Sequence, residues 1–584
     1  MALLALIYGI YRKPTPINSV FFEFRRTERL KNTIRVWMFL LGGVVVFGQW
    51  MRLPFYKYLL KQLADPVAVL ANGWGALHTV GLFLIVAAEI ILIAQWSTYL
   101  FYAWVGAAHY RLPVAPPLAA DPPEVIVLIP ACNEDPEIME RSIASIVKLD
   151  YPNYRAYLVE NSKTDEYKQI AVKLAEKHGL KVLHVPNRGS KAAALNDALP
   201  KVRSGAKYMA IFDVDHEVAS DYLRVLVPIL EADDKLAFVQ TPQLYVNAEE
   251  NFITRAAAMQ EMLLYDTIME AKGSYSRALC CGSNDLVRIK AIDDVGGWDE
   301  TTVSEDLATS FLMHLRGWRS VYHRRAFAIG VGPTTLKNYW AQQRRWAEGN
   351  TAVAKNILRR LFTYKFFSLD WKLHLDYLWS AGYYIATLAL VYLAIFPMLL
   401  TVAVRMAAVG TEWMHISASR PIEWVYLSVY PLYAVAMMFP YVHMRLRGYA
   451  LRNLAMLQGL LACTMPIYVG SVLKGLLTSN RVFEITPKQA VKSTFSIWSR
   501  PQPFIFLVLL TSGALLFDEL LSHAAITFAW ILMMWMFIWS LSASHIFIFA
   551  LQDKLLPKRA AETNQDSLNS PQIEINVAET EANS

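Results

Sequence analysis

The chain has 584 residues, 55% of them hydrophobic and only 18% charged, with a mean hydropathy of +0.27. Ordinary soluble domains carry about 25% charged residues, so this composition is not that of a soluble globular protein and predicts membrane spans. The net charge of +7 fits lysines and arginines placed beside anionic lipid, and it gives no support for a nucleic-acid-binding protein.

The N-terminal region, residues 1–106, is expected to contain an interfacial helix followed by two membrane spans. Residues 1–14 are apolar but lack a basic start and a cleavage site, which favours a helix lying in the interface over a signal peptide. The spans are predicted over 36–51 and 80–106, since about 20 apolar residues cross a bilayer. Basic residues before the first span place that end in the cytoplasm: Arg12, Lys13, Arg25, Arg26, Arg29, Lys31 and Arg35.

Residues 107–375 are predicted to form a cytoplasmic domain in which strands alternate with helices. The apolar strand-like runs are 124–134, 154–165, 180–187 and 207–218, and helical segments are expected at 141–152 and 167–179. This alternation predicts an α/β fold with a mostly parallel sheet, whose ligands bind at the carboxyl ends of the strands. Polar pairs do follow these strands: Asn133 and Glu134, Glu160 and Asn161, and Asp213 and Asp215.

The strand over 207–218 contains the sequence F-D-V-D, with Asp213 and Asp215. Hard oxygen ligands from a short turn suit Mg²⁺ or Mn²⁺, which usually bind one or two carboxylates together with substrate phosphates. A solvated acidic turn is the simpler explanation for an isolated D-x-D. The position at a strand end favours the metal site.

Two predicted helix starts carry charged residues. Lys191 follows a glycine turn within residues 187–199, where the start of a helix favours anions, although simple capping explains the same pattern. Glu305 and Asp306 stand at the front of a helix within 301–318, where Ser304 could act as the cap. Acids in a first turn also stabilise the helix dipole without any catalytic role.

The run LKNYWAQQRRWAEGN, residues 336–350, is predicted to be a helix. Spacings of three and four residues put Gln342, Arg345 and Trp346 on one face. A basic amphipathic helix at a membrane surface is the alternative interpretation.

The C-terminal region, residues 376–556, is expected to add four spans to the first two, at 377–402, 424–441, 503–520 and 525–551. Residues 454–476 are also apolar, but basic residues flank both ends, which favours a helix in the cytoplasmic interface. Trp379, Tyr383 and Tyr384 could line a channel or form an aromatic belt. Residues 557–584 are polar and are predicted to be disordered.

In combination, the runs FDVD, CCGSND, VSEDLATSFLMHLRGW and QQRRW resemble the processive, membrane-embedded family 2 glycosyltransferases, which include cellulose, curdlan and hyaluronan synthases. The resemblance covers the cytoplasmic domain and the layout of the spans. The run FEITPK, residues 483–488, looks like the gating loop of cellulose synthases and points to the glucan-synthase branch.

The resemblance implies a GT-A-type nucleotide-sugar domain with Mg²⁺ or Mn²⁺ as cofactor, and it implies the following roles. Asp306 is the general base, with Glu305 beside it. The nucleotide-sugar donor is bound by Asn133, Glu134, Glu160, Lys191, Asp213, Asp215, Gln342 and Arg345, of which the aspartates of the D-x-D hold the metal. The acceptor is bound by Trp346, Cys281, Gly282 and Ser283, and the gating loop is represented by Phe483, Thr486 and Lys488.

The implied function is the processive, inverting transfer of glucose from UDP-glucose to a growing β-glucan, with β-1,3 or β-1,4 linkages, and its translocation across the inner membrane. The lipid bilayer and envelope export proteins are the further partners. Alternatives are a synthase of hyaluronan or of a GlcNAc polymer, a non-processive membrane glycosyltransferase, and a catalytically inactive scaffold or transporter. Retention of the acidic and Q-x-x-R-W motifs argues against the inactive classes.

The sequence also departs from the pattern of these synthases. Glu160, Asn161 and Ser162 replace the usual Asp-Asp-Gly of the nucleotide loop, and Cys132 stands where cellulose synthases often have tyrosine.

None of the four cysteines shows a C-x-x-C spacing, which argues against zinc and fits a reducing compartment. No cyclic-di-GMP-binding signature is found in the C-terminal region, so regulation through such a domain is not expected.

Overall fold

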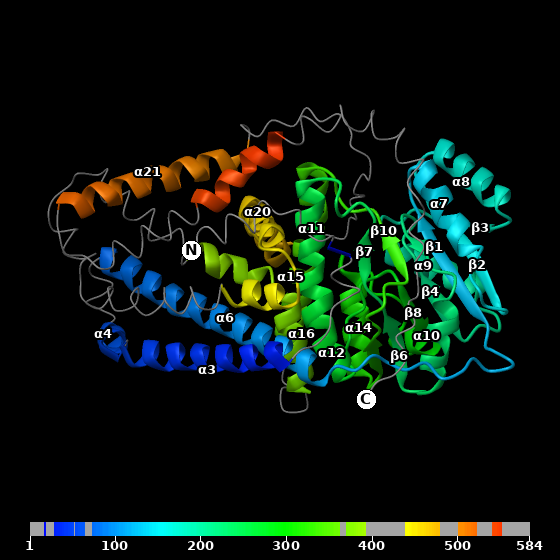
Figure 1. Ribbon diagram of the computed structural model, residues 1–584, viewed down its shortest axis with the longest axis horizontal. Coiled ribbons are helices and arrows are strands. Elements are labelled where there is room, and N and C mark those ends of the chain that lie inside the picture. Colours follow the sequence, from blue (N-terminus) through cyan, green and yellow to red (C-terminus); the bar gives the residue numbers. More distant parts are fainter. Residues whose placement is uncertain are drawn as a thin grey trace.

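The computed structural model describes residues 17–18, 28–51, 53–64, 73–362, 370–392, 438–478, 500–522 and 540–551. An α/β domain lies at one end, and long helices extend away from it toward the other end (Figure 1). The predicted gating loop, residues 483–488, and the predicted tail, residues 557–584, lie outside the described residues.

The α/β domain is built on a seven-stranded sheet with the order β3-β2-β1-β4-β8-β6-β9. Strands β3, β2, β1 and β4 are parallel, β8 is antiparallel to both of its neighbours, and β6 is parallel to β9. The predicted mixed, mostly parallel α/β sheet is therefore confirmed. The strands are β1 (Val125–Ala131), β2 (Tyr154–Glu160), β3 (Lys181–His184), β4 (Tyr208–Ile211), β6 (Leu236–Gln240), β8 (Asp285–Arg288) and β9 (Arg319–Tyr322).

A smaller sheet stands beside the first and has the order β5-β10-β7. Its strands are β5 (Glu217–Val218), β10 (Ala328–Gly330) and β7 (Gln243–Tyr245). β10 pairs antiparallel with β5 and parallel with β7, and so brings together segments from three distant parts of the domain.

Helices cover both faces of the large sheet, as β1 shows. Ile126 and Leu128 of β1 pack into one core with residues of α9 (Lys191–Val202), α13 (Ile289–Val295) and α14 (Glu305–Leu315). Val127 and Ile129 pack into another core with residues of α7 (Pro136–Ile146), α8 (Asp165–Lys177) and α10 (Tyr222–Glu231). Because successive side chains of a strand point to opposite faces, a strand buried on both sides reads as a continuous apolar run.

Further helices join this domain to the apolar part of the molecule. Helix α11 (Phe252–Leu263) continues through the π-helical turn η1 (Leu264–Met269) into α12 (Glu270–Ser274). The others are α15 (Leu336–Leu361), α16 (Trp371–Ala381) and α20 (Leu451–Leu477), together with the peripheral helices α3 (Glu28–Met51), α4 (Leu53–Ala64), α6 (Gly73–His109) and α21 (Pro501–Ser522).

A buried ionic cluster fastens the π-helical turn to the segment before α20. The Asp266 carboxylate lies 2.9 Å from Arg324, and Glu270 lies 3.1 Å from Arg324 and 3.0 Å from Arg447. Arg447 is fully buried. Because removing one partner of a buried pair costs about 3–5 kcal/mol, this cluster fixes the position of the α/β domain against residues 438–450.

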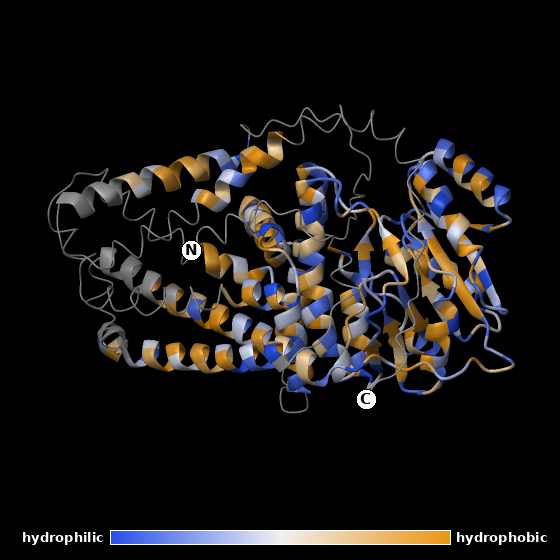
Figure 2. Ribbon diagram, viewed as in Figure 1, coloured by the Kyte–Doolittle hydropathy of each residue, from blue (hydrophilic) through white to orange (hydrophobic). Residues whose placement is uncertain are grey.

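Three helices of the described part are long and apolar enough to cross a membrane: Arg29–Trp50, Val86–His109 and Leu451–Leu477. The first two coincide with the predicted spans at 36–51 and 80–106, and their side chains are strongly apolar (Figure 2). Phe39 is 81% exposed and Val46 is 71% exposed on α3, as expected for a lipid-facing surface.

The structure does not reproduce the six predicted spans within the described residues. Of the other four predicted spans, 377–402, 424–441 and 525–551 lie partly outside the described residues. The remaining one, 503–520, falls on α21, whose apolar stretch among the described residues is only Pro501–Thr511. Conversely, the segment predicted to lie in the interface, 454–476, is the helix α20, which has the length and hydropathy of a span.

Candidate active site

Two aspartates follow the fully buried strand β4 at its carboxyl end. The Asp213 backbone amide donates a hydrogen bond to Ser283 Oγ at 2.8 Å. The Asp215 carboxylate accepts a hydrogen bond from the Val331 backbone amide at 3.3 Å. The D-x-D predicted from the sequence is thus held between the large sheet and the segment after β10, where the strands of both sheets end.

His216 joins the two aspartates in a potential cation site. Ligand atoms of Asp213, Asp215 and His216 all lie within 4.8 Å of one another. The buried Nδ1 of His216 lies 3.6 Å from Asp215 Oδ1 and makes no hydrogen bond to the described residues. A buried nitrogen without a hydrogen bond, facing two carboxylates, fits a divalent cation, and the carboxylate oxygens suit Mg²⁺ or Mn²⁺.

Lys191 occupies the first position of α9 and reaches the first aspartate. Ser190 caps the helix by accepting a hydrogen bond from the Ala193 backbone amide at 3.1 Å. The Lys191 ammonium group forms an ion pair with Asp213 and donates to the Gly282 carbonyl oxygen at 2.7 Å. Burial alone would raise the pKa of Asp213, but the Lys191 charge, the His216 charge and the hydrogen bond from Lys191 together outweigh it and hold this pKa below its usual value. Asp213 therefore stays ionised at neutral pH.

Glu305 and Asp306 are the first two residues of α14, as predicted. Ser304 takes the N-cap position, but its hydroxyl makes no capping hydrogen bond, contrary to the expectation from the sequence. The Leu307 backbone amide instead donates to Asp306 Oδ1 at 2.7 Å. Gly282 has a φ of +79°, and a Cβ atom there would lie 3.0 Å from Asp306 Oδ2. The predicted acceptor turn thus lies directly against the Asp306 carboxylate.

The two carboxyl groups of α14 lie in a strongly charged and buried environment. Burial raises the pKa of Asp306, and burial together with the Asp306 charge raises the pKa of Glu305 to about 7. The Lys191 ammonium group acts in the opposite direction on both groups. A carboxylate with a raised pKa is a better proton acceptor near neutral pH than an ordinary surface aspartate.

Gln342, Arg345 and Trp346 project from α15 into one cavity, as the helical spacing predicts. Burial lowers the pKa of Arg345, and the acidic side chains that oppose this effect are, in order, Glu305, Asp213, Asp306 and Asp215. The guanidinium group therefore stands among the four carboxylates of the two acidic motifs. Trp346 packs with Tyr384 and Tyr468 on the apolar side of the same cavity.

The loops after β1, β2 and β3 form a second group of predicted residues. Asn133 has a φ of 54°, and its backbone amide donates to Ser162 Oγ at 2.9 Å. Glu160 accepts from the Ser162 backbone amide at 2.6 Å, and its other oxygen lies 3.2 Å from His184 Nδ1. Glu134 follows directly after Asn133. These residues form the adjoining sheet edge and do not line the cavity.

A single cavity of about 510 Å³ connects the acidic motifs to the apolar helices. Its polar end is lined by Lys191, Asp213, Asp215, Glu305, Asp306 and Arg345, together with the predicted acceptor residues Cys281 and Gly282. Its other end is lined by Trp96, Tyr99 and Tyr102 of α6, by Trp379, Tyr383 and Tyr384, and by Leu454, Leu457 and Leu461 of α20. Ser283 lies beneath this surface, where its hydroxyl supports Asp213.

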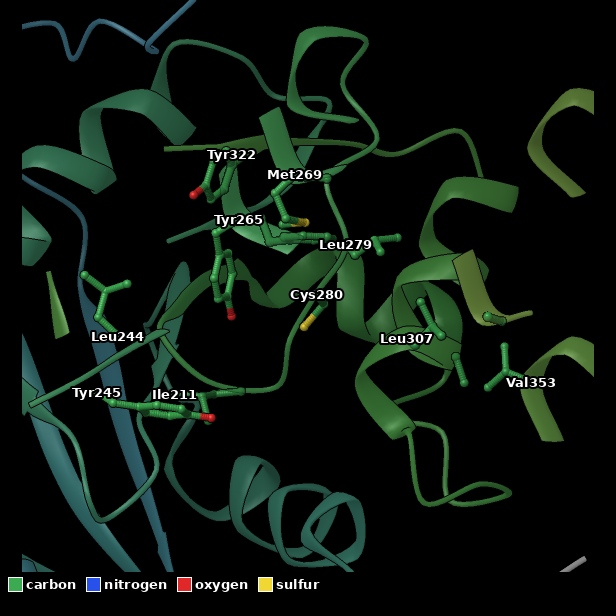
Figure 3. Close-up of a cluster of buried hydrophobic side chains, with 14 of the residues drawn as sticks. Ile211, Leu244, Tyr245, Tyr265, Met269, Leu279, Cys280, Leu307, Tyr322 and Val353 are labelled. Atoms are coloured by element: carbon green, nitrogen blue, oxygen red, sulfur yellow. The ribbon is translucent and has the colours of Figure 1, made fainter. Parts of the chain in front are cut away.

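The cavity residues that were not predicted from the sequence include His216, Tyr245 and Glu261. His216 directly follows the D-x-D, so the extended run D-x-D-H could have indicated it. Tyr245 and Glu261 come from β7 and α11, and no local pattern marks them. Figure 3 shows Tyr245, Tyr265 and Cys280 among the side chains of one buried cluster, to which separate elements contribute.

The mixed sheet, the paired carboxylates at its strand ends and the basic residues among them define a nucleotide-sugar glycosyltransferase domain. Residues 122–349 match the family model described as glycosyltransferase like family 2, and residues 277–438 match the model described as cellulose synthase. This part of the chain is a family 2 glycosyltransferase domain related to the cellulose synthases.

Curated relatives match part of the chain. The beta-monoglucosyldiacylglycerol synthase of Nostoc sp. is 30% identical over 293 residues, which are 48% of this chain and 58% of the relative. The probable glucomannan 4-beta-mannosyltransferase 11 of Oryza sativa subsp. japonica is 33% identical over 265 residues, which are 44% of this chain and 46% of the relative. The chain thus spans about half the length of the curated relatives it matches.

Among solved structures, the mannosyltransferase PcManGT from Pyrobaculum calidifontis, in complex with GDP-Man and Mn²⁺, is similar with a TM-score of 0.45 and 18% identity. The match covers 68% of this chain and 99% of that chain.

Proposed function

We propose that the protein is a processive, inverting glycosyltransferase that polymerises glucose from UDP-glucose into a β-glucan and moves the product across the inner membrane. The observation that carries this proposal is the cavity, in which the acidic motifs and the aromatic side chains of the apolar helices share one continuous space. Flat aromatic faces offer apolar contact to sugar rings, and a polymer that leaves through such a cavity stays bound between additions.

In the proposed reaction, Asp306 accepts the proton of the acceptor hydroxyl as its oxygen attacks C1 of the donor sugar. The bond between C1 and the diphosphate oxygen breaks on the opposite face, so the anomeric configuration inverts. Arg345 and Lys191 neutralise the charge that develops on the departing UDP, because fixed charges in a buried site need no reorganisation. A divalent cation held by Asp213, Asp215 and His216 would supply further Lewis-acid stabilisation of the diphosphate.

A second candidate is the transfer of a single sugar to a lipid. Part of the cavity is apolar, with Leu454, Leu457 and Leu461 on one wall, and one relative is a beta-monoglucosyldiacylglycerol synthase. Trp346 and the tyrosines on the same side of the cavity favour the saccharide acceptor.

Product analysis tests the proposal. The purified protein in nanodiscs that contain diacylglycerol is offered radiolabelled UDP-glucose, UDP-GlcNAc or UDP-glucuronate, each separately. We expect label from UDP-glucose in an ethanol-insoluble polymer that β-1,3- or β-1,4-glucanase digests. Label found only in the organic extract would support the glycolipid product, and polymer from another donor would support a different polysaccharide synthase.

We further propose that α20 lies in the cytoplasmic interface and does not cross the membrane. Near its first turn, the Arg452 guanidinium group stands 5.3 Å from the ring centre of Phe252 in α11. At its last turn, Lys474 pairs with Glu348 of α15 at 2.9 Å. A helix of 27 residues is about 40 Å long, so contact with the catalytic domain at both ends supports an orientation along the domain.

Cysteine labelling tests this orientation. A cysteine placed at Thr478, the residue that ends α20, should resist an impermeant maleimide added to intact cells and react after the cells are permeabilised. The parent protein, with its four native cysteines, gives the background. Labelling of intact cells above that background would show that α20 crosses the membrane.

A further inference from the structure

Glu261 is a buried acid in the wall of the cavity, near the end of α11. The residue is 8% exposed. The next acids along the same helical segment, Asp266 and Glu270, both pair with Arg324 within 3.1 Å. Within the described part of the chain, no lysine, arginine or histidine nitrogen lies within 4.0 Å of Glu261. An acid kept in an apolar setting without a cation is costly, so a structural role in the fold does not explain its presence.

A fixed tyrosine orients the Glu261 carboxyl group. The Tyr245 hydroxyl donates to Glu261 Oε1 at 3.3 Å, and both residues line the cavity together with Gln342. The Tyr245 ring has little freedom, because a Cβ atom at Gly332 would lie 2.6 Å from its Cδ2. A tyrosine with little freedom therefore orients the Glu261 carboxyl group, in the same cavity as the Q-x-x-R-W face of α15.

Glu261 also lies within reach of the reacting end of the cavity. Tyr265, one helical turn further along, lines the same cavity as Cys281, and Cys281 precedes the glycine that abuts Asp306. Four residues of helix advance by about 6 Å, so Glu261 lines the same cavity as Asp306 about one helical turn from Tyr265.

The chemistry of a carboxyl group limits what it can bind there. Two oxygens on one carbon can accept hydrogen bonds from two neighbouring hydroxyls, which a pyranose presents as a vicinal diol. Burial raises the pKa of Glu261 to about 7, so the protonated form, which both donates and accepts, is also populated near neutrality. A diacylglycerol carries one free hydroxyl, which Asp306 must take, and its ester carbonyls only accept hydrogen bonds, so they cannot pair with the ionised form of Glu261.

We propose that Glu261 is an acceptor-specificity residue, whose carboxyl group binds vicinal hydroxyls of a saccharide acceptor and so selects a sugar chain over a glyceride. The proposal rests on the glycosyltransferase function proposed above, and it adds the substrate class of the acceptor side. Tyr245 is the positioning residue that holds the carboxyl group in place.

Two variants test the proposal in the full-length protein in nanodiscs. Glu261→Leu removes the hydrogen bonds and fills the apolar wall, whereas Glu261→Gln keeps one acceptor and one donor at nearly the same size. Glu250→Gln, a surface change just before α11, is the matched control. The measurements are the KM for a β-gluco-oligosaccharide, the rate of UDP-glucose hydrolysis without acceptor, and the Kd of UDP from calorimetry.

For Glu261→Leu we expect the oligosaccharide KM to rise about tenfold or more, as follows from the loss of hydrogen bonds to a buried polar group. Hydrolysis and UDP binding should stay within about twofold of the parent, and Glu261→Gln should recover most of the lost affinity. An unchanged oligosaccharide KM in Glu261→Leu would overturn the role proposed for Glu261 but not the proposed function. A parallel loss of UDP binding in both variants would also overturn that role. A parent protein that glycosylates diacylglycerol but no saccharide would overturn the proposed function itself.

Discussion

Gly349 lies seven residues after Gln342 on α15, and thus on the same helix face as the Q-x-x-R-W residues. It packs against Ser304, directly before the two acids of α14. A Cβ atom at Gly349 would lie 2.2 Å from Ser304 Oγ and 2.8 Å from its backbone nitrogen. The hydroxyl can rotate away, but the backbone cannot. We therefore predict that Gly349→Ala displaces the start of α14.

The size of the effect follows from these distances. Ordinary contacts begin at 3.4 Å, so a backbone atom at 2.8 Å must retreat by about 0.6 Å. Overpacking of this kind costs about 1–3 kcal/mol, and a misplacement near 1 Å can cost about 10²-fold in rate. Because Asp306 is the second residue after Ser304, we expect turnover to fall between about tenfold and a hundredfold while UDP binding stays nearly unchanged.

The assay compares polymer formation, UDP affinity and thermal unfolding for Gly349→Ala and a matched control. Gly470→Ala is the control, because Gly470 is also a helical glycine and a Cβ atom there would meet no other atom within 4 Å. The control should keep its activity. Adding Ser304→Ala to Gly349→Ala removes the hydroxyl clash but not the backbone clash, so only part of the activity should return. Parent-level turnover in Gly349→Ala would refute the packing argument.

The remaining predictions concern the acidic motifs and α15. Asp306→Asn keeps the size of the side chain but cannot accept a proton, so polymer formation should be almost lost with UDP binding intact; normal turnover at parent expression would reject the base assignment. Asp215→Ala should abolish activity together with the Mg²⁺- or Mn²⁺-dependence of UDP binding, as calorimetry with and without metal can show. Arg345→Lys should weaken UDP binding because lysine lacks the planar fork, whereas Trp346→Ala should slow elongation and spare UDP binding; equal losses of UDP affinity would count against an acceptor role for Trp346. Because burial raises the pKa of Asp306 and only its ionised form is a base, kcat/KM should fall about tenfold per unit as pH drops below that pKa, and a profile that stays flat from neutral pH down through the ordinary range of aspartate would contradict this.

The sequence predicted those elements whose buried residues form an unbroken apolar run along the chain. Strands β1 and β4 are apolar on both faces and were found, and the polar residues after them do meet at one edge of the sheet. The helix expected over 141–152 is α7, which starts earlier, at Pro136, and ends at Ile146. Asp135 caps it by accepting from two backbone amides, and this signal, followed by proline at the first position, was present in the sequence.

The rest of the site depends on pairings between distant segments. β8 runs antiparallel between β4 and β6, and this places Ser283 beneath Asp213. β10 pairs with β7, and this brings Gly332 against Tyr245. Each of these strands has only three to five residues, too few for a periodic pattern to fix its partner. Tyr245 and Glu261 could therefore not be placed in the cavity from the sequence.

The packing of helix α15 explains why glutamine, arginine and tryptophan occur together in the short run Q-x-x-R-W. Its face toward the domain sets Arg345 among the carboxylates of two motifs, and it carries Gly349 against the start of α14. On another side, Glu348 pairs with Lys474 of α20, and a Cβ atom at Gly475 would lie 2.9 Å from the Glu348 carbonyl oxygen. Close packing transmits small displacements rather than absorbing them. A shift of α20 must therefore move α15, and with it the charges that face the departing diphosphate.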